Sequence, residues 1–76
     1  MIIIRCIRCG RKVLKYQKLG TGRLWHCWKA RIVEDYSVRE GTEVKCPCGN
    51  MIGIEQAKWI KLKQGAFSYS GVTIKR

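Results

Sequence analysis

The chain has 76 residues, with 16 lysines and arginines against five acidic residues and a formal net charge of +11 at pH 7. This length allows one small domain, which buries only about 60% of its unfolded surface and commonly needs a metal, a disulfide or a partner for stability. The five cysteines are an odd number, which argues against a closed disulfide framework, and neither a signal peptide nor a membrane span is recognised. We therefore expect a cytoplasmic protein with reduced thiols that does not bind a membrane.

The positive charge is concentrated at the two ends of the chain. Residues 1–33 hold nine cations and no acid, residues 34–55 hold all five acids and two cations, and residues 56–76 hold five cations and no acid. Such a charge favours polyanions, and nucleic acid first among them, although a solvated cationic surface would also account for it.

The first predicted elements are two strands, at residues 2–5 and 12–16, rich in β-branched and apolar residues. They flank the motif Cys6-x-x-Cys9-Gly10. Residues 5–23 hold seven cations and are expected to form a basic N-terminal hairpin around this motif.

The next segment, residues 24–35, fits two structures. As a strand it places alternate residues from Leu24 to Ile32 on one face, including His26 and Trp28, and Cys27 on the other. As a helix it aligns Leu24, Trp28 and Ile32 in one stripe. The frequent β-branched and aromatic residues, and the lack of a strong capping residue, favour the strand.

Four more strands are predicted in the rest of the chain, at residues 43–45, 51–54, 58–63 and 67–74. In the third of these, Ile60 and Leu62 alternate with more polar neighbours, which is the period of a strand. We expect the last two strands to form a C-terminal β-hairpin over residues 57–74. The whole chain, residues 1–76, is thus predicted to be a single all-β domain of short antiparallel strands.

The cysteines form two similar pairs, each between two predicted strands and each ending in Cys-Gly. In a zinc knuckle a tight turn aims two thiolates at one point, and the glycine permits the positive φ that closes the turn. Knuckles at residues 6–10 and 46–49 would together bind one structural zinc per chain, through Cys6, Cys9, Cys46 and Cys48.

Cys27 and His26 remain alternative ligands, because the second pair is one residue shorter than the usual Cys-x-x-Cys. If Cys48 cannot reach the metal, Cys27 could replace it. On a strand His26 and Cys27 point to opposite faces, so both cannot easily bind one ion. A cysteine between two tryptophans is more often a small apolar core residue.

The motifs Cys-x-x-Cys-Gly and Cys-Pro-Cys-Gly between strands resemble the zinc-ribbon superfamily, over residues 4–16 and 44–55. The resemblance implies a small three-stranded β unit with a structural zinc, of the kind found in ribosomal proteins, transcription factors and RNA polymerase subunits. The shortened second pair departs from the family pattern.

No catalytic arrangement is recognised in the sequence. Four thiolates close the zinc shell and leave no open position for water. The single histidine, His26, has no acidic residue nearer in sequence than Glu34 and Asp35, and no phosphate-binding loop motif occurs. We therefore expect that the protein is not an enzyme.

Aromatic residues are interleaved with cations, a pattern typical of surfaces that stack unpaired bases and bind phosphates, although the same rings could pack in the core. We expect binding to RNA, with ribosomal RNA as one candidate and DNA less favoured. The alternative is an adaptor that binds a protein of a ribonucleoprotein or transcription complex through residues 34–55 and exposed aromatic residues. The predicted nucleic-acid-binding residues are Arg8, Arg11, Lys12, Lys15, Lys18, Arg23, Trp25, Lys29, Arg31, Trp59, Lys61 and Lys63.

Overall fold

The computed structural model describes residues 1–19 and 24–71, and within these ranges it contains nine short strands and one 3-10 helix. The fold is all-β, as the sequence predicts. No helix in the described ranges is both long and apolar enough to cross a membrane. The elements are β1 (Ile2–Cys6), β2 (Lys12–Tyr16), β3 (His26–Trp28), η1 (Lys29–Arg31), β4 (Ile32–Asp35), β5 (Val38–Glu40), β6 (Glu43–Lys45), β7 (Met51–Glu55), β8 (Trp59–Leu62) and β9 (Phe67–Gly71).

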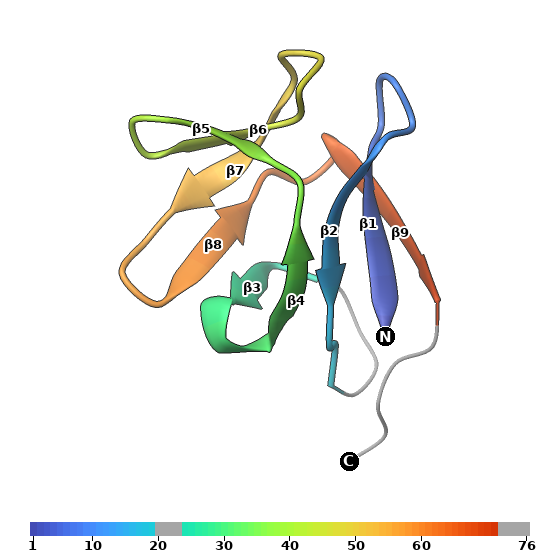
Figure 1. Cartoon of the computed structure of the whole chain (residues 1–76), viewed down its shortest axis with the longest axis vertical. Coiled ribbons are helices and arrows are strands. Elements are labelled where there is room, and N and C mark those ends of the chain that lie inside the picture. The colour runs from blue at the N-terminus through green and yellow to red at the C-terminus, as the bar shows by residue number, and fades with distance from the viewer. Residues whose placement is uncertain (20–23, 72–76) are drawn as a thin grey trace.

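The strands form two antiparallel sheets (Figure 1). The first sheet has the order β4-β2-β1-β9, and the second has the order β3-β8-β7-β6-β5. The loop between β1 and β2 and the loop between β6 and β7 belong to different sheets. They nevertheless lie close together at one end of the molecule, at the top of Figure 1.

One buried cluster of side chains receives residues from both sheets. In β1, Ile2, Ile4 and Cys6 are buried and alternate with more exposed residues, as expected for a strand with one face in the core. In β8, Ile60 and Leu62 are buried, which confirms the predicted alternation. Each large apolar side chain buried in this way contributes about 1.5–3 kcal/mol. The cluster is completed by Val13, Leu14, Tyr16, Leu24, Cys27, Val44, Cys46 and Ile52.

Residues 24–35 are extended at both ends of the segment, as the strand prediction requires, but η1 interrupts them. β3 pairs with β8 and β4 pairs with β2, so the 3-10 turn carries the chain from one sheet to the other. The predicted alternation is therefore found within each strand but does not continue through η1. In β3, Cys27 is buried and His26 and Trp28 are exposed, and in β4, Ile32 is half-buried and Val33 is exposed. Leu24, predicted on the same face as His26 and Trp28, is instead buried, because it precedes the paired part of the strand.

The expected C-terminal hairpin over residues 57–74 is not formed among the described residues. β8 pairs with β7 and β3, whereas β9 pairs with β1. The connection between β8 and β9 is anchored on the cysteine loops, since the Ala66 carbonyl accepts hydrogen bonds from the Ile7 amide and from the Asn50 side chain, both at 3.1 Å. This anchoring directs β9 to the edge of β1. Residues 72–74 of the expected hairpin lie outside the described residues.

The expected N-terminal hairpin is present where it is described. β1 and β2 pair antiparallel around the first cysteine pair. Residues 20–23 of the expected 5–23 segment lie outside the described residues.

Candidate metal centre and cationic surface

The first cysteine pair lies in the turn between β1 and β2. The Cys6 amide donates to the Arg11 carbonyl at 2.9 Å, and the Gly10 amide donates to the Cys6 carbonyl at 2.9 Å. Gly10 has a φ of +76°, a conformation that residues with a side chain rarely adopt. This is the positive φ that the Cys-Gly motif predicts, and it closes the turn behind Cys9.

The second cysteine pair repeats this arrangement with one residue fewer. The Cys46 amide donates to the Asn50 carbonyl at 2.9 Å, and the Gly49 amide donates to the Cys46 carbonyl at 2.8 Å. Gly49 has a φ of +100°. Each of these hydrogen bonds spans one residue less than its counterpart in the first turn. A tighter turn therefore accommodates the shortened Cys-x-Cys pair, and Cys48 reaches the same point as the other cysteines.

The two turns bring four cysteine sulfurs together. The Sγ atoms of Cys6, Cys9, Cys46 and Cys48 all lie within 4.8 Å of one another, with Cys6 and Cys48 at 3.6 Å and Cys9 and Cys46 at 3.4 Å. A zinc–sulfur bond of about 2.3 Å places tetrahedral ligands about 3.8 Å apart. The cluster therefore fits a tetrahedral metal ion with small adjustments, and four cysteine sulfurs are soft ligands that suit zinc.

Cys6 accepts hydrogen bonds from two groups outside the cluster. The Arg8 amide and the Asn50 side-chain amide each donate to its sulfur at 3.4 Å. Burial acts to raise the pKa of Cys6, but hydrogen bonds, including one from the backbone of Cys9, lower this pKa to about 6. Asn50 is a site residue that the sequence prediction missed. The available signal was its position directly after the second Cys-Gly.

The pKa of the Cys46 thiol is shifted in the opposite direction to that of Cys6. Burial raises the pKa of its thiol to about 12, and the contact with the Cys9 sulfur adds to this increase. Neighbouring thiols do not all ionise without a cation, because their negative charges repel one another. A metal that binds here must displace the remaining protons, so its affinity decreases as the pH falls.

Cys27 and His26 do not belong to this cluster. Cys27 is fully buried on β3, where it pairs with Ile60 of β8, and burial raises the pKa of its thiol to about 12. His26 lies on the exposed face of the same strand, with its ring centroid 5.9 Å from that of Trp59. The described structure thus groups the other four cysteines without either alternative ligand.

We expect Cys27→Ser to leave the metal content unchanged. It should lower the free energy of unfolding by about 1–2 kcal/mol, because a hydroxyl is less compatible with an apolar site than a thiol. Elemental analysis and denaturant unfolding measure the two quantities, and Cys27→Ala separates loss of the thiol from burial of a hydroxyl. A loss of metal in Cys27→Ser, with full metal content in Cys48→Ser, would show that the ligand set is wrong.

All five acidic side chains take part in ion pairs. Lys12 lies 3.5 Å from Glu34, and Lys29 lies 2.9 Å from Glu55. Two predicted nucleic-acid-binding cations, Lys12 and Lys29, are therefore held by carboxylates. The complete set of pairs is Lys12–Glu34, Lys29–Glu55, Arg39–Asp35, Arg39–Glu55, Lys45–Glu40 and Lys45–Glu43.

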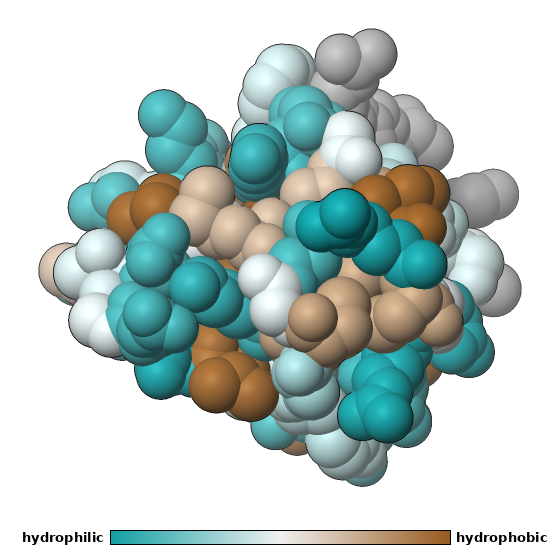
Figure 2. Space-filling view, turned by 90° about the horizontal axis from the view of Figure 1, so that it is seen from above, coloured by the Kyte–Doolittle hydropathy of each residue, from teal (hydrophilic) through white to brown (hydrophobic). Residues whose placement is uncertain are grey.

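Other exposed cations have no carboxylate partner within residues 1–19 and 24–71. Arg8 and Arg11 lie on the first cysteine turn, and Lys61 and Lys63 lie in β8 and just after it. Arg8 and Lys63 line one hollow of about 320 Å³, together with Asn50. Seen from the end that carries both cysteine loops, the surface shows hydrophilic side chains interspersed with hydrophobic ones (Figure 2).

The remaining predicted residues are distributed more widely. Trp25 is exposed, whereas Trp59 is half-buried and contacts the ring of Trp28. Lys18 is buried, and Lys15 lies opposite Glu34 in the pairing of β2 and β4. The guanidinium of Arg31 lies over the ring of Tyr16 at 5.7 Å, and Arg23 lies outside the described residues.

No protein-family model, curated protein or solved structure matches this chain in the three comparisons. The resemblance to zinc ribbons therefore rests on the two cysteine motifs and on the cluster that they form.

Proposed function

We propose that this protein is a small zinc-stabilised RNA-binding protein, with ribosomal RNA among its candidate ligands. Four cysteine sulfurs are the number that closes a tetrahedral zinc shell, which leaves no position for a catalytic water. Zinc would join the two sheets at the end where their cysteine loops meet. A chain of 76 residues commonly depends on such additional stabilisation. A binding role is therefore favoured over catalysis.

The proposal that the protein binds RNA rests on the distribution of ion pairs. Because the five carboxylates are taken up by Lys12, Lys29, Arg39 and Lys45, the exposed cations left without a carboxylate partner in the described residues include Arg8 and Arg11 of the first cysteine turn and Lys61 and Lys63, in β8 and just after it. Cations that bind phosphates release the counterions of the nucleic acid, and this release drives association. The backbone of Arg8 is fixed by its hydrogen bond to the Cys6 sulfur, which reduces the entropy lost on binding.

RNA is favoured over duplex DNA because aromatic rings are exposed near these cations. Trp25 is 53% exposed, and its carbonyl accepts a hydrogen bond from the Leu62 amide at 2.9 Å, which places its backbone beside β8. Exposed rings next to cations suit unpaired bases, which single-stranded and looped RNA presents.

The salt dependence of binding tests this proposal. For the zinc-loaded protein and a labelled single-stranded RNA, the logarithm of the association constant should fall with the logarithm of salt concentration. The expected slope is about −2 to −4, from about three to five phosphate contacts. No binding at moderate salt, or a slope near zero, would contradict the proposal. That result would favour the adaptor that binds a protein through exposed aromatic residues.

A further inference from the structure

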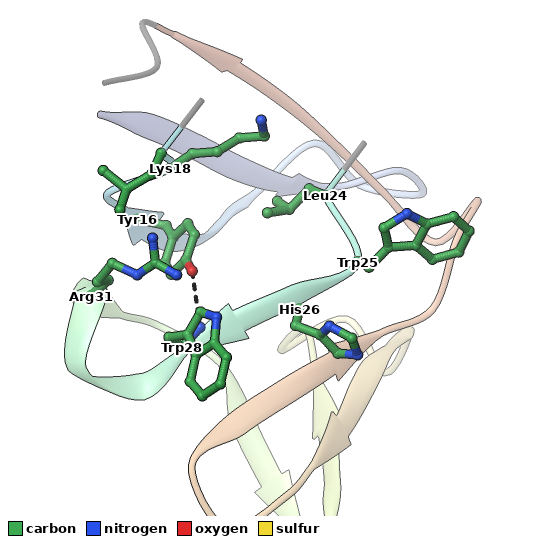
Figure 3. A pocket seen from close by; sticks show the side chains of 8 residues that line it. Tyr16, Lys18, Leu24, Trp25, His26, Trp28 and Arg31 are labelled. Atoms are coloured by element: carbon green, nitrogen blue, oxygen red, sulfur yellow. Dashed lines mark hydrogen bonds between the residues drawn. The ribbon is translucent and has the colours of Figure 1, made fainter. Parts of the chain in front are cut away.

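A hollow of about 220 Å³ opens beside β3, away from the metal cluster. Buried Tyr16 and Leu24 form its apolar base, and the exposed rings of Trp25 and Trp28 line it. Figure 3 shows Tyr16, Trp28 and Arg31 gathered at one end of the hollow and Trp25 at the other. The hollow is smaller than the roughly 300–1,000 Å³ that encloses a drug-sized molecule, so it suits one planar group.

The Trp28 end of the hollow is held in place by contacts on several sides. The Trp28 amide donates to the Tyr16 hydroxyl at 2.9 Å (Figure 3), which ties β3 to the buried tyrosine. The Trp28 ring meets the Trp59 ring at 5.3 Å between centroids and an angle of 61°. Trp28 still keeps 42% of its surface exposed. A ring that is both fixed and exposed loses little entropy when a second ring stacks on it.

The charges around the hollow favour an anionic ligand. Lys18 and Arg31 line it, and among the described residues no carboxylate does. The Arg31 guanidinium lies 5.7 Å from the centre of the Tyr16 ring and forms no ion pair within the described chain. An apolar peptide side chain would fill the hollow without using the Arg31 guanidinium. A nucleotide uses both features, because its base is planar and apolar on its faces and its phosphate is anionic.

We infer that this hollow binds one unpaired nucleotide of a single-stranded RNA, with the base stacked on Trp28 and the phosphate at Arg31. The inference rests on the proposed function and adds to it the site that recognises one unpaired base and its phosphate. Duplex RNA keeps its bases stacked inside the helix, so it offers only phosphates and sugars to this surface.

The test compares two RNA ligands of equal length, a single-stranded oligonucleotide and a duplex, by fluorescence anisotropy at fixed salt. The single strand should bind more tightly than the duplex. Trp28→Leu keeps apolar bulk beside Trp59 but removes the stacking ring, and it should weaken single-strand binding by about 5- to 150-fold, which corresponds to about 1–3 kcal/mol. Trp28→Phe should restore part of the affinity. Tyr36→Ala, which removes an exposed ring outside the hollow, is the matched control and should bind like the parent.

Arg31→Gln gives an independent test that leaves the rings in place. It should weaken single-strand binding. It should also reduce the steepness with which the logarithm of the association constant falls with the logarithm of salt concentration, since one phosphate contact is lost. Equal binding of single strand and duplex, unchanged by Trp28→Leu and by Arg31→Gln, would overturn the inference and leave the phosphate-binding proposal standing. If neither RNA binds at moderate salt, the proposed function fails and the inference fails with it.

Discussion

Cys48→Ser should lose its stoichiometric metal and most of its folded structure. A serine hydroxyl does not replace the thiolate that zinc prefers, and the remaining three sulfurs would leave the shell open. Structural zinc contributes about 10–16 kcal/mol in zinc-finger peptides at neutral pH, which is comparable to the whole stability of a small domain. Far-UV circular dichroism and elemental analysis of the purified variant measure the two losses.

Cys27→Ser is the matched control for this experiment, because it makes the same substitution at a cysteine outside the cluster. Chelation of the parent protein should reproduce the effect of Cys48→Ser, and added zinc should reverse it. A Cys48→Ser protein that keeps one metal per chain and its circular dichroism spectrum would contradict the ligand set.

Simultaneous neutralisation of Arg8, Arg11 and Lys63 should remove most of the electrostatic part of RNA binding. These cations are exposed and have no carboxylate partner in the described chain. Loss of three phosphate contacts should flatten the log–log salt slope by about two units on a single strand, or about 100-fold in affinity at 0.1 M salt. Lys12, which begins β2 directly after this turn, is left unchanged because it pairs with Glu34.

The charge-matched control is the triple alanine variant of Lys12, Lys29 and Lys45. It removes the same number of positive charges, but from cations that are held by carboxylates. Its affinity should fall much less than that of the first variant. Similar losses in both variants would mean that net charge alone, and not the exposed cations of the cysteine turn and β8, determines binding.

The sequence was sufficient to predict the features that depend on neighbouring residues. The period of two in residues 58–63 identified the buried face of β8. The Cys-Gly pairs predicted turns with positive φ, because this conformation is readily available only to glycine. The grouping of the four sulfurs followed from the presence of two such turns.

The features that the sequence did not reveal depend on contacts between distant segments. Alternation of residues identifies a strand but does not determine its partner, so β9 was expected beside β8 although it pairs with β1. The hydrogen bond from the Asn50 side chain to the Ala66 carbonyl, one of two that anchor the chain before β9, joins two segments with no shared motif. A count of charges in the sequence also does not show which cations form ion pairs. Lys12 and Lys29 are paired with carboxylates in the structure, whereas other exposed cations among the described residues are not.

The metal content of the natively purified protein tests the central claim most directly. Elemental analysis of folded protein, purified without a metal-affinity step, should give one zinc per chain, bound through the four clustered cysteines. A folded protein with no stoichiometric metal would contradict the account, because the two sheets would then be stable without the ion proposed to join them.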